Sequence, residues 1–293
     1  MTATIIDGKA IAAQIREQVR QDVEQRLRDN KSRPGLATVL VGDDTASASY
    51  VRMKHKASAE AGIQSFRHDL PVSVSQEEVE DLVRQLNADP TVHGILVQLP
   101  LPAKFDEERI LNLISVEKDV DGIHPFNIGR LAQKGRDPRF VSCTPAGIMV
   151  LIHSVLPDLT GANAVVLGRS NIVGMPVALL LIRENATVTV CHSRTKNLAQ
   201  TCAQADVLIA AVGRLEMVKK EWIKPGAVVI DVGTNRVDDP AAKRGYHLAG
   251  DVAFDEVKDI AGAISPSPGG VGPMTIAMLM KNTLHSAQLM DEP

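Results

Sequence analysis

The fold of this chain is indicated by the stretch Val165-Val-Leu-Gly-Arg-Ser-Asn-Ile-Val-Gly174. It has the pattern of a buried β-strand, a tight turn at Gly168 and the start of a helix, where Gly174 permits close packing on a sheet. The amides at such a helix start can face a pyrophosphate. The stretch is not G-x-G-x-x-G, so taken alone it is also compatible with a purely structural turn. We predict a Rossmann-like dinucleotide site here.

Strands and helices alternate along the chain on both sides of this stretch. In the second half we predict strands over 164–167, 187–191, 206–212 and 227–232 and helices over 173–182, 198–205 and 274–289. In the first half we predict helices over 11–27, 46–61 and 77–86 and strands over 36–41, 63–70 and 94–99. The alternation predicts an α/β fold with parallel βαβ units.

Length and composition favour a cytoplasmic two-domain enzyme. The chain has 293 residues, a length that suits two domains, and 32 basic against 35 acidic residues give a net charge of −3. A dedicated nucleic-acid binder would need a basic excess. The longest apolar run, residues 175–182, is too short to cross a membrane, and we expect no signal peptide.

The cysteines indicate a reducing compartment. Their number is odd and no C-x-x-C pair occurs; they are Cys143, Cys191 and Cys202. We therefore expect neither a disulfide framework nor a zinc site, and we assign no metal.

The end of the second strand favours NADP over NAD. An NAD site usually carries an acid there, about 20 residues after the glycines, to bind the ribose hydroxyls. Here the strand ends Cys191-His-Ser-Arg-Thr195, with no acid. Arg194, with Arg169 in the turn, can bind the 2′-phosphate of NADP, because guanidinium matches phosphate geometry. Taken alone, both arginines could equally be solvated surface charges.

Four polar residues of the first half are candidates for a substrate site. Tyr50 and Lys54 lie one turn apart in a predicted helix, on one face. Burial would lower the pKa of Lys54 and make it a versatile acid/base, although most such lysines are solvated. Gln98 lies near the carboxyl end of a predicted buried strand, where parallel sheets bind ligands, but a satisfied structural amide is possible. Asp121 could accept paired N–H bonds from an aminopyrimidine edge, or only form a turn before Gly122.

The motifs, taken in order, resemble one known family. They are Val41-Gly-Asp-Asp44, Ala46-Ser47, Tyr50-Val-x-x-Lys54, Gly94-Ile-Leu-Val-Gln-Leu-Pro-Leu-Pro102, Lys118-Asp-Val-Asp-Gly122, Cys143-Thr-Pro145, Gly168-Arg-Ser-x-x-Val-Gly174 and Pro268-Gly-Gly-Val-Gly-Pro-Met-Thr275. Over essentially the whole chain they resemble the bifunctional methylenetetrahydrofolate dehydrogenase/methenyltetrahydrofolate cyclohydrolase (FolD) family.

The resemblance implies two α/β lobes with a cleft between them. Residues 1–142 would form a folate-binding catalytic lobe, on which the C-terminal helix, residues 273–293, packs back. Residues 143–272 would form a Rossmann-like NADP-binding domain. Family members are typically homodimers through their nucleotide domains.

The resemblance also implies two reactions and their residues. Methylenetetrahydrofolate is oxidised by NADP to the methenyl form, and water then opens this product to 10-formyltetrahydrofolate. Lys54 would be the acid/base, Gln98 would tune it and place the water, Tyr50 would pack on the folate and Asp121 would hold the pterin edge. The other substrate-binding residues implied are Ser47, Leu99, Pro100, Pro268, Gly269 and Gly270. The cofactor-binding residues implied are Thr144, Gly168, Arg169, Ser170, Ile172, Val173, Ser193, Arg194, Val212, Gly213, Gly233 and Thr234.

Three positions depart from the family pattern. Thr45 and Ser142 stand where the family commonly has proline, and Ser265-Pro-Ser-Pro268 replaces Thr-Pro-Val-Pro. These changes leave the proposed catalytic groups in place and put loop rigidity in question. Two other hypotheses are a nucleotide-binding sensor that has lost catalysis and an NADP-dependent dehydrogenase of another small metabolite. The four substrate-site residues argue against the first and the folate motifs against the second.

Overall fold

A computed structural model describes residues 2–242 and 245–291, with the side chains of Thr45 and Ala46 left out. The departure at Thr45 therefore lies outside what the structure describes. The chain divides into two compact units: unit 1 comprises Met1–Ala12 and Thr144–Thr275, and unit 2 comprises Ala13–Cys143 and Ile276–Pro293. The first twelve residues thus differ from the predicted division, because strand β1 (Thr4–Ile5) pairs with β11 (Ala263–Ile264) of the second half.

Unit 1 is built on a six-stranded parallel sheet. Its order is β1-β11-β8-β7-β5-β6, where β8 is Val228–Asp231, β7 is Val207–Ala210, β5 is Asn163–Leu167 and β6 is Thr187–Cys191. All five strand pairings are parallel. The chain passes from β5 to β6 on one side and then returns to β7 on the other, so the strand order reverses between β5 and β7. In a Rossmann-like sheet, ligands bind at the carboxyl ends of the strands at such a switch point.

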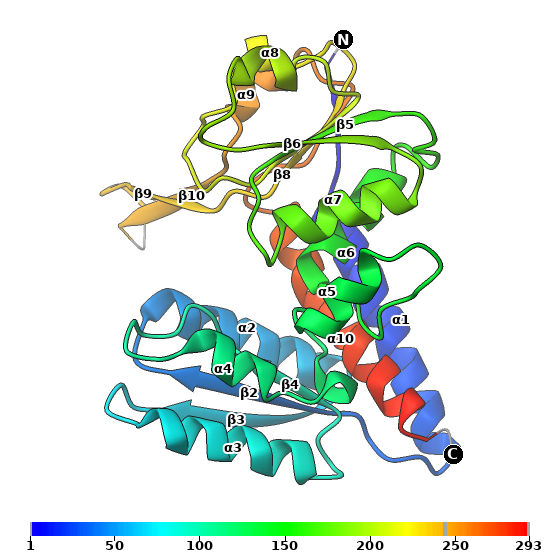
Figure 1. The fold of residues 1–293 in the computed structure, drawn as a ribbon, viewed down its shortest axis with the longest axis vertical. Coiled ribbons are helices and arrows are strands. Elements are labelled where there is room, and N and C mark those ends of the chain that lie inside the picture. The colour runs from blue at the N-terminus through cyan, green and yellow to red at the C-terminus, as the bar shows by residue number, and fades with distance from the viewer. Residues whose placement is uncertain (1, 243–244, 292–293) are drawn as a thin grey trace. The chain divides into compact units, whose positions relative to one another are not determined.

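Short helices and one hairpin complete unit 1 (Figure 1). The helices are α7 (Gly174–Arg183), α8 (Leu198–Cys202), α9 (Phe254–Val257), the 3₁₀ helix η2 (Lys220–Trp222) and most of α6 (Cys143–His153). The hairpin joins β9 (Asn235–Asp238) to β10 (Tyr246–Ala249) in antiparallel pairing. The strands β7 and β8 are fully buried, as expected for a parallel sheet with helices on its faces.

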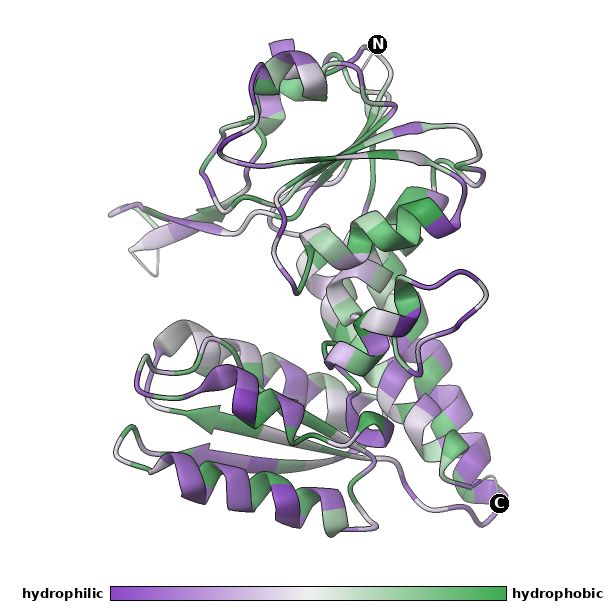
Figure 2. Cartoon of the chain, in the orientation of Figure 1, coloured by the Kyte–Doolittle hydropathy of each residue, from purple (hydrophilic) through white to green (hydrophobic). Residues whose placement is uncertain are grey.

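Unit 2 contains a three-stranded parallel sheet in the order β3-β2-β4 (Figure 1). The strands are β2 (Gly35–Val41), β3 (Gln64–Leu70) and β4 (Gly94–Val97). Figure 2 shows β2 hydrophobic and β3, at the sheet edge, more hydrophilic. This difference follows from position, because the central strand is buried on both faces whereas the edge strand meets water.

Helices cover both faces of this sheet. The helices of unit 2 are α1 (Gly8–Arg28), α2 (Thr45–Glu60), α3 (Gln76–Ala88), α4 (Glu107–Asn112), the 3₁₀ helix η1 (Val116–Lys118), α5 (Pro125–Leu131) and most of α10 (Val271–Leu289). The three boundaries between the units fall within α1, α6 and α10. One face of the sheet forms a core with α3 and α4, and on the other face Thr38 of β2 contacts His55 of α2. A capping box of Ser75 and Glu78 begins α3.

The predicted α/β fold and its long elements are confirmed. The short elements β1, α4, η1, α5, η2, β9, β10, α9 and β11 were not predicted, since two to seven residues carry little periodic signal. The eleven-residue helix α6 was also missed, because its nearly continuous apolar run has no helical period. Within residues 2–242 and 245–291, no helix combines the length and the apolar character that crossing a membrane requires.

Candidate active site

Lys54 is a buried ammonium in the middle of α2. The helix is fixed at its start by Asp44, whose carboxylate accepts a hydrogen bond from the Ser47 amide at 2.7 Å. Lys54 is only 8% exposed, and its Nζ donates to Gln98 Oε1 at 3.0 Å. The condition set for Lys54 as an acid/base, that its ammonium is buried, is therefore met in the structure.

Gln98 is held in place from two sides. It follows β4 at the carboxyl edge of the sheet, and its backbone amide donates to Val39 O at 2.8 Å. Its side-chain Nε2 donates to Leu99 O at 2.7 Å, which leaves Oε1 facing Lys54. The amide is thus oriented by the backbone and presents an acceptor to the ammonium.

Asp121 and Cys143 complete the surroundings of Lys54. Burial lowers the pKa of the Lys54 ammonium below its ordinary value of 10.5, and the negative charge of nearby Asp121 opposes this shift. Burial also raises the pKa of the Cys143 thiol well above 9.0, so this group stays a neutral thiol. Cys143 Sγ donates to Val120 O at 3.2 Å. Sequence reasoning missed Cys143 as a neighbour of the lysine, although the Cys-Thr-Pro motif marked the position.

Other predicted substrate residues lie on the same elements. Tyr50 is half-buried one turn before Lys54, and Ser47 is buried in the first turn of α2. Leu99 is half-buried and Pro100 is exposed directly after Gln98. The structure thus brings Lys54, Gln98 and Asp121 together, and Tyr50, Ser47, Leu99 and Pro100 lie on the same elements.

The loop that carries Asp121 is anchored at two points that were not predicted. Lys118 Nζ donates to three carbonyl oxygens at the end of α3, those of Leu86 at 2.9 Å, Asn87 at 2.8 Å and Asp89 at 2.7 Å. Asp119 accepts from Asn127 Nδ2 at 2.7 Å and from the His124 amide at 2.9 Å. Burial raises the pKa of Asp119 to about 6.

Ser142, which departs from the family pattern, also supports this loop. Its buried hydroxyl donates to Gly122 O at 2.6 Å. Gly122 has φ +70°, and a Cβ there would lie 2.5 Å from the Ser142 amide nitrogen. The hydrogen bond therefore restrains a loop that the loss of proline had been expected to loosen.

A second group of predicted residues lies at the carboxyl edge of the unit 1 sheet. After β5, Gly168 has φ +121°, and a Cβ there would meet Ala211 O, after β7, at 2.1 Å. Only glycine allows these two loops to approach so closely. Arg169, Ser170 and Ile172 follow with exposed side chains, and Val173 is half-buried.

At the start of α7, backbone amides that were expected to face a ligand are hydrogen-bonded within the chain. Ser170 Oγ accepts from the amides of Val173 and Gly174 at 3.2 and 3.3 Å, and Ser170 O accepts from the Met175 amide at 3.0 Å. The next residue, Pro176, has no N–H. That the amides at this helix start face a pyrophosphate stays a prediction; in this structure the amides of Val173 and Gly174 are bonded to Ser170 Oγ. The two bonds to Ser170 Oγ leave its own hydrogen to donate to an anion.

The loops after the other strands hold the remaining cofactor candidates. Ser193 and Arg194 are exposed after β6, where the Arg194 amide donates to His192 Nδ1 at 3.2 Å. Val212 and Gly213 follow β7, and Gly233 and Thr234 follow β8. Three exposed arginines, Arg169, Arg194 and Arg214, thus follow the neighbouring strands β5, β6 and β7. A glycine-lined edge with exposed guanidinium groups fits a dinucleotide with an additional phosphate.

The last predicted residues also lie in unit 1. Gly269 has φ +116°, and the Gly270 amide donates to Pro266 O at 2.8 Å, which closes a turn in which Pro268 is exposed. Thr144 and Thr275 hydroxyls are 2.9 Å apart.

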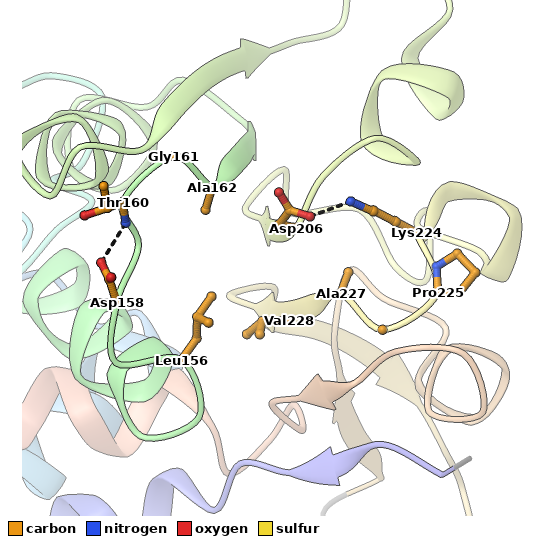
Figure 3. A pocket seen from close by; sticks show the side chains of 11 residues that line it. Leu156, Asp158, Thr160, Gly161, Ala162, Asp206, Lys224, Pro225, Ala227 and Val228 are labelled. Atoms are coloured by element: carbon orange, nitrogen blue, oxygen red, sulfur yellow. Dashed lines mark hydrogen bonds and ion pairs between the residues drawn. The ribbon is translucent and has the colours of Figure 1, made fainter.

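Neither a metal cluster nor a second candidate cofactor site emerges from the described residues. Among them, no group of three or more histidine, cysteine or acidic residues could hold a metal. A surface hollow of about 430 Å³ lies at the opposite, amino edge of the sheet, before β5, β7 and β8 (Figure 3). Its polar groups are paired, Asp206 with Lys224 at 2.5 Å and Asp158 with the Thr160 amide at 2.9 Å. It contains no predicted site residue.

The fold and the two groups of residues define an α/β enzyme with a dinucleotide-binding unit. The model of the "Tetrahydrofolate dehydrogenase/cyclohydrolase, catalytic domain" matches residues 6–121, and that of the family's "NAD(P)-binding domain" matches residues 142–291. The chain belongs to the tetrahydrofolate dehydrogenase/cyclohydrolase family.

Known relatives match nearly the whole of this chain. The chloroplastic bifunctional protein FolD 4 of Arabidopsis thaliana is 56% identical over 98% of this chain and 79% of its own. The bifunctional protein FolD of a Bradyrhizobium strain is 56% identical over 98% of this chain and 96% of its own. The crystal structure of the Trypanosoma brucei enzyme, complexed with NADP and an inhibitor, has a TM-score of 0.97 at 42% identity and covers 100% of both chains.

The predicted family and pair of activities are thereby confirmed. The chain is a methylenetetrahydrofolate dehydrogenase and methenyltetrahydrofolate cyclohydrolase, and folate one-carbon derivatives are the substrates of its family. The predicted cofactor, NADP, agrees with the NAD(P)-binding domain and with the T. brucei structure.

Proposed function

We propose that both activities of this chain depend on the group formed by buried Lys54 and half-buried Gln98 and Asp121. The observation that carries the proposal is the Lys54 ammonium, buried in α2 and bonded to the neutral amide oxygen of Gln98. Burial favours the neutral amine, which is the form that accepts a proton, and the charge of nearby Asp121 only opposes this effect in part.

Lys54 is the general base of the cyclohydrolase step in this proposal. Water adds to the methenyl carbon of the cationic substrate, and Lys54 Nζ takes a proton from that water. When the ring opens, N5 leaves the carbon and receives the second proton, so hydrolysis of the cation releases one proton overall. Gln98 Oε1 orients the amine, and Lys54 then gives its proton to solvent, which is the one proton released overall.

The dehydrogenase step depends more on position than on proton transfer. NADP supplies the nicotinamide that accepts a hydride from the methylene carbon of the substrate. The chain's own part is to hold that carbon in place. We assign this to Asp121 on the pterin edge and to Tyr50 against the folate, with Ser47, Leu99 and Pro100 as further walls. Pro268, Gly269 and Gly270 in unit 1 stay predicted substrate-binding residues.

We assign the carboxyl edge of the unit 1 sheet to NADP. Arg169, Ser170 and Arg194 bind the 2′-phosphate, since these exposed donors stand where an NAD site would carry an acid. The other residues of this edge are Thr144, Gly168, Ile172, Val173, Ser193, Val212, Gly213, Gly233 and Thr234.

Residues 1–142 and the C-terminal helix serve as the folate lobe in this proposal, and residues 143–272 as the cofactor domain.

We also propose a cytoplasmic homodimer. Light scattering would test the homodimer, and a measured mass of one chain would contradict it. One relative is chloroplastic, so the cytoplasmic location must be tested by cell fractionation.

A two-wavelength assay tests the proposed function. One preparation is given methylenetetrahydrofolate and NADP, and NADPH formation and methenyltetrahydrofolate are followed together. We expect NADPH to form without lasting accumulation of the methenyl product. If the methenyl product accumulated and then decayed only at its uncatalysed rate, a cyclohydrolase role for Lys54 would be contradicted.

A further inference from the structure

Two buried carboxylates lie behind the cofactor edge of unit 1, and none of the roles given above uses them. Asp231 is the last residue of β8, and Asp251 follows β10. Both are buried, Asp231 at 3% and Asp251 at 0% exposure. A buried carboxylate is costly unless hydrogen bonds compensate it, so their partners are informative.

Asp251 collects three consecutive backbone amides. Its Oδ2 accepts from Val212 at 2.7 Å and Gly213 at 2.9 Å, and its Oδ1 accepts from Arg214 at 2.8 Å. Oδ1 also accepts from Asn235 Nδ2 at 3.0 Å. Successive amides that point to one side form an anion-binding nest, and here the chain's own carboxylate fills it.

Asp231 holds the backbone that carries Asp251. Its Oδ1 accepts from the amides of Gly233 and Asp251, both at 2.9 Å, and its Oδ2 accepts from the Val252 amide at 3.1 Å. Burial raises the pKa of Asp231 to about 7. The two carboxylates therefore form one connected network, from β8 through Asp251 to the loop after β7.

The backbone around the network leaves no space for side chains. A Cβ on Gly233 would lie 2.3 Å from Asp251 Oδ1, and one on Gly250 would lie 1.7 Å from Asp231 Oδ2. Both glycines therefore let the main chain pack directly on a carboxylate, and the loops have little freedom to shift.

The network ends at the ligand-binding part of the sheet. The loop at 212–214 follows β7, which borders the switch point, and Gly233 and Asn235 follow the neighbouring β8. We propose that Asp251, held by Asp231, is a positioning residue for NADP: its carboxylate fixes the loop at 212–214 and Asn235 in the cofactor-binding conformation. This inference rests on the proposed assignment of Val212, Gly213 and Gly233 to the cofactor.

The physical effect of Asp251 is preorganisation. Without its charge, the three amides lose a common acceptor and the loop must be ordered when NADP binds, which weakens binding. Charge-assisted hydrogen bonds are the strong ones, so we expect loss of the charge to raise the KM for NADP by roughly tenfold or more. Cyclohydrolase turnover consumes no NADP and should keep its kcat and its KM for the methenyl substrate.

The test compares Asp251→Asn with Asp206→Asn. Asp206 is a matched control, since it also accepts a backbone amide, that of Asn163 at 2.9 Å, but at the opposite edge of the same sheet. For each variant we would measure the Kd and KM for NADP, cyclohydrolase activity without NADP, and hydrogen exchange of amides 212–214. We expect Asp251→Asn to lose protection at 212–214 and affinity for NADP, whereas Asp206→Asn changes neither.

Two outcomes would overturn the inference. One is lost protection at 212–214 with unchanged NADP affinity, and the other is an equal loss of NADP affinity in Asp206→Asn. If Asp251→Asn does not fold, Asn235→Ala, which removes one bond to Asp251, should still raise the KM for NADP severalfold, and an unchanged KM would count against the proposal. Failure of the assignment of this edge to NADP is distinguishable, because Arg169→Ala and Arg194→Ala would then leave the KM for NADP unchanged.

Discussion

The two candidate sites differ in how far hydrogen bonds compensate their buried charged groups. In unit 2, the buried ammonium of Lys54 donates to a neutral amide oxygen. In unit 1, the buried carboxylate of Asp251 accepts from three backbone amides and one side-chain amide. A charged group with few compensating bonds is poised to change its protonation state, whereas a fully compensated one fixes the groups around it.

Two lysines of unit 2 show the same difference within one unit. Burial lowers the pKa of both Lys54 and Lys118. Lys118 donates to three carbonyl oxygens, which hold it as a structural ammonium at the end of α3. Lys54 donates to Gln98 and lies near Asp121, and it is the lysine that can exchange a proton with a substrate.

The largest expected effect is on the cyclohydrolase activity of Lys54→Gln. Glutamine keeps the length and hydrogen bonding of the side chain but cannot accept a proton. A general acid/base contributes about 10²–10⁴-fold, so we expect cyclohydrolase turnover to fall by that order or more. Dehydrogenase activity should remain measurable, because hydride transfer depends on alignment. The ratio of the two rates in one preparation is the measurement.

Lys56→Gln is the matched control for this substitution. Lys56 lies on the same helix but is exposed, with an ion pair to Glu60 at 3.7 Å. It should leave both rates unchanged. Normal cyclohydrolase with lost dehydrogenase activity in Lys54→Gln would show that Lys54 is not the proton-transfer group.

The second expected effect is on the pH profile of the cyclohydrolase. The neutral amine is the active form, so kcat should rise with pH as Lys54 loses its proton. Burial lowers its pKa, so this rise should be centred below 10.5, the ordinary value for lysine. In Asp121→Asn the rise should move to lower pH, since the charge that raises the pKa of Lys54 is removed. Rates are corrected for uncatalysed hydrolysis, and a rise centred at or above 10.5 would contradict a neutral Lys54.

The fold could be predicted from sequence where its pattern was long. The helices and strands with regular apolar spacing, such as α3 with Val79, Val83 and Leu86 buried, were found by periodicity alone. The pairing of β1 with β11 could not be predicted, because two-residue strands have no pattern and their contact joins the two ends of the chain.

The candidate site could be predicted in residue type but less well in orientation. Sequence reasoning selected Lys54 and Gln98 but could not show that a hydrogen bond joins them. It selected Ser170, but not that its oxygen accepts from the helix start. Asp231 carried an unused signal: an acid directly after Val228-Val-Ile230, at the carboxyl end of a buried strand.

The third expected effect is on folate binding by Asp121→Ala. Loss of a carboxylate that accepts paired N–H bonds should weaken folate binding by roughly ten- to hundredfold. Both activities should fall, while the affinity for NADP stays nearly intact, because Asp121 belongs to unit 2. Calorimetric titration of each ligand measures this. Lost NADP binding with unchanged folate binding would reverse the assignment of the two sites.

The fourth expected effect is on cofactor choice. The wild type should prefer NADP over NAD in kcat/KM, because the end of β6 carries His192-Ser193-Arg194 and no acid. Arg169→Ala should raise the KM for NADP by roughly tenfold and change the KM for NAD much less, since only NADP has the additional phosphate. NAD thus serves as the internal control. Equal increases for both cofactors would show that Arg169 does not contact the 2′-phosphate.

The smallest expected effect distinguishes a loop support from a residue of the site. Ser142→Ala removes the hydroxyl that donates to Gly122 O, next to Asp121. A buried hydrogen bond contributes about 1 kcal/mol to the free energy of unfolding, so Tm should fall by roughly 2–4 °C. The KM for folate should rise no more than about fivefold, because the bond holds the loop rather than the ligand. Ser154→Ala, which removes a similar bond to Leu151 O at 2.7 Å, is the control and should lower Tm without changing that KM. An unchanged KM for folate in Ser142→Ala would mean that Lys118 and Asp119 are sufficient to hold the loop of Asp121.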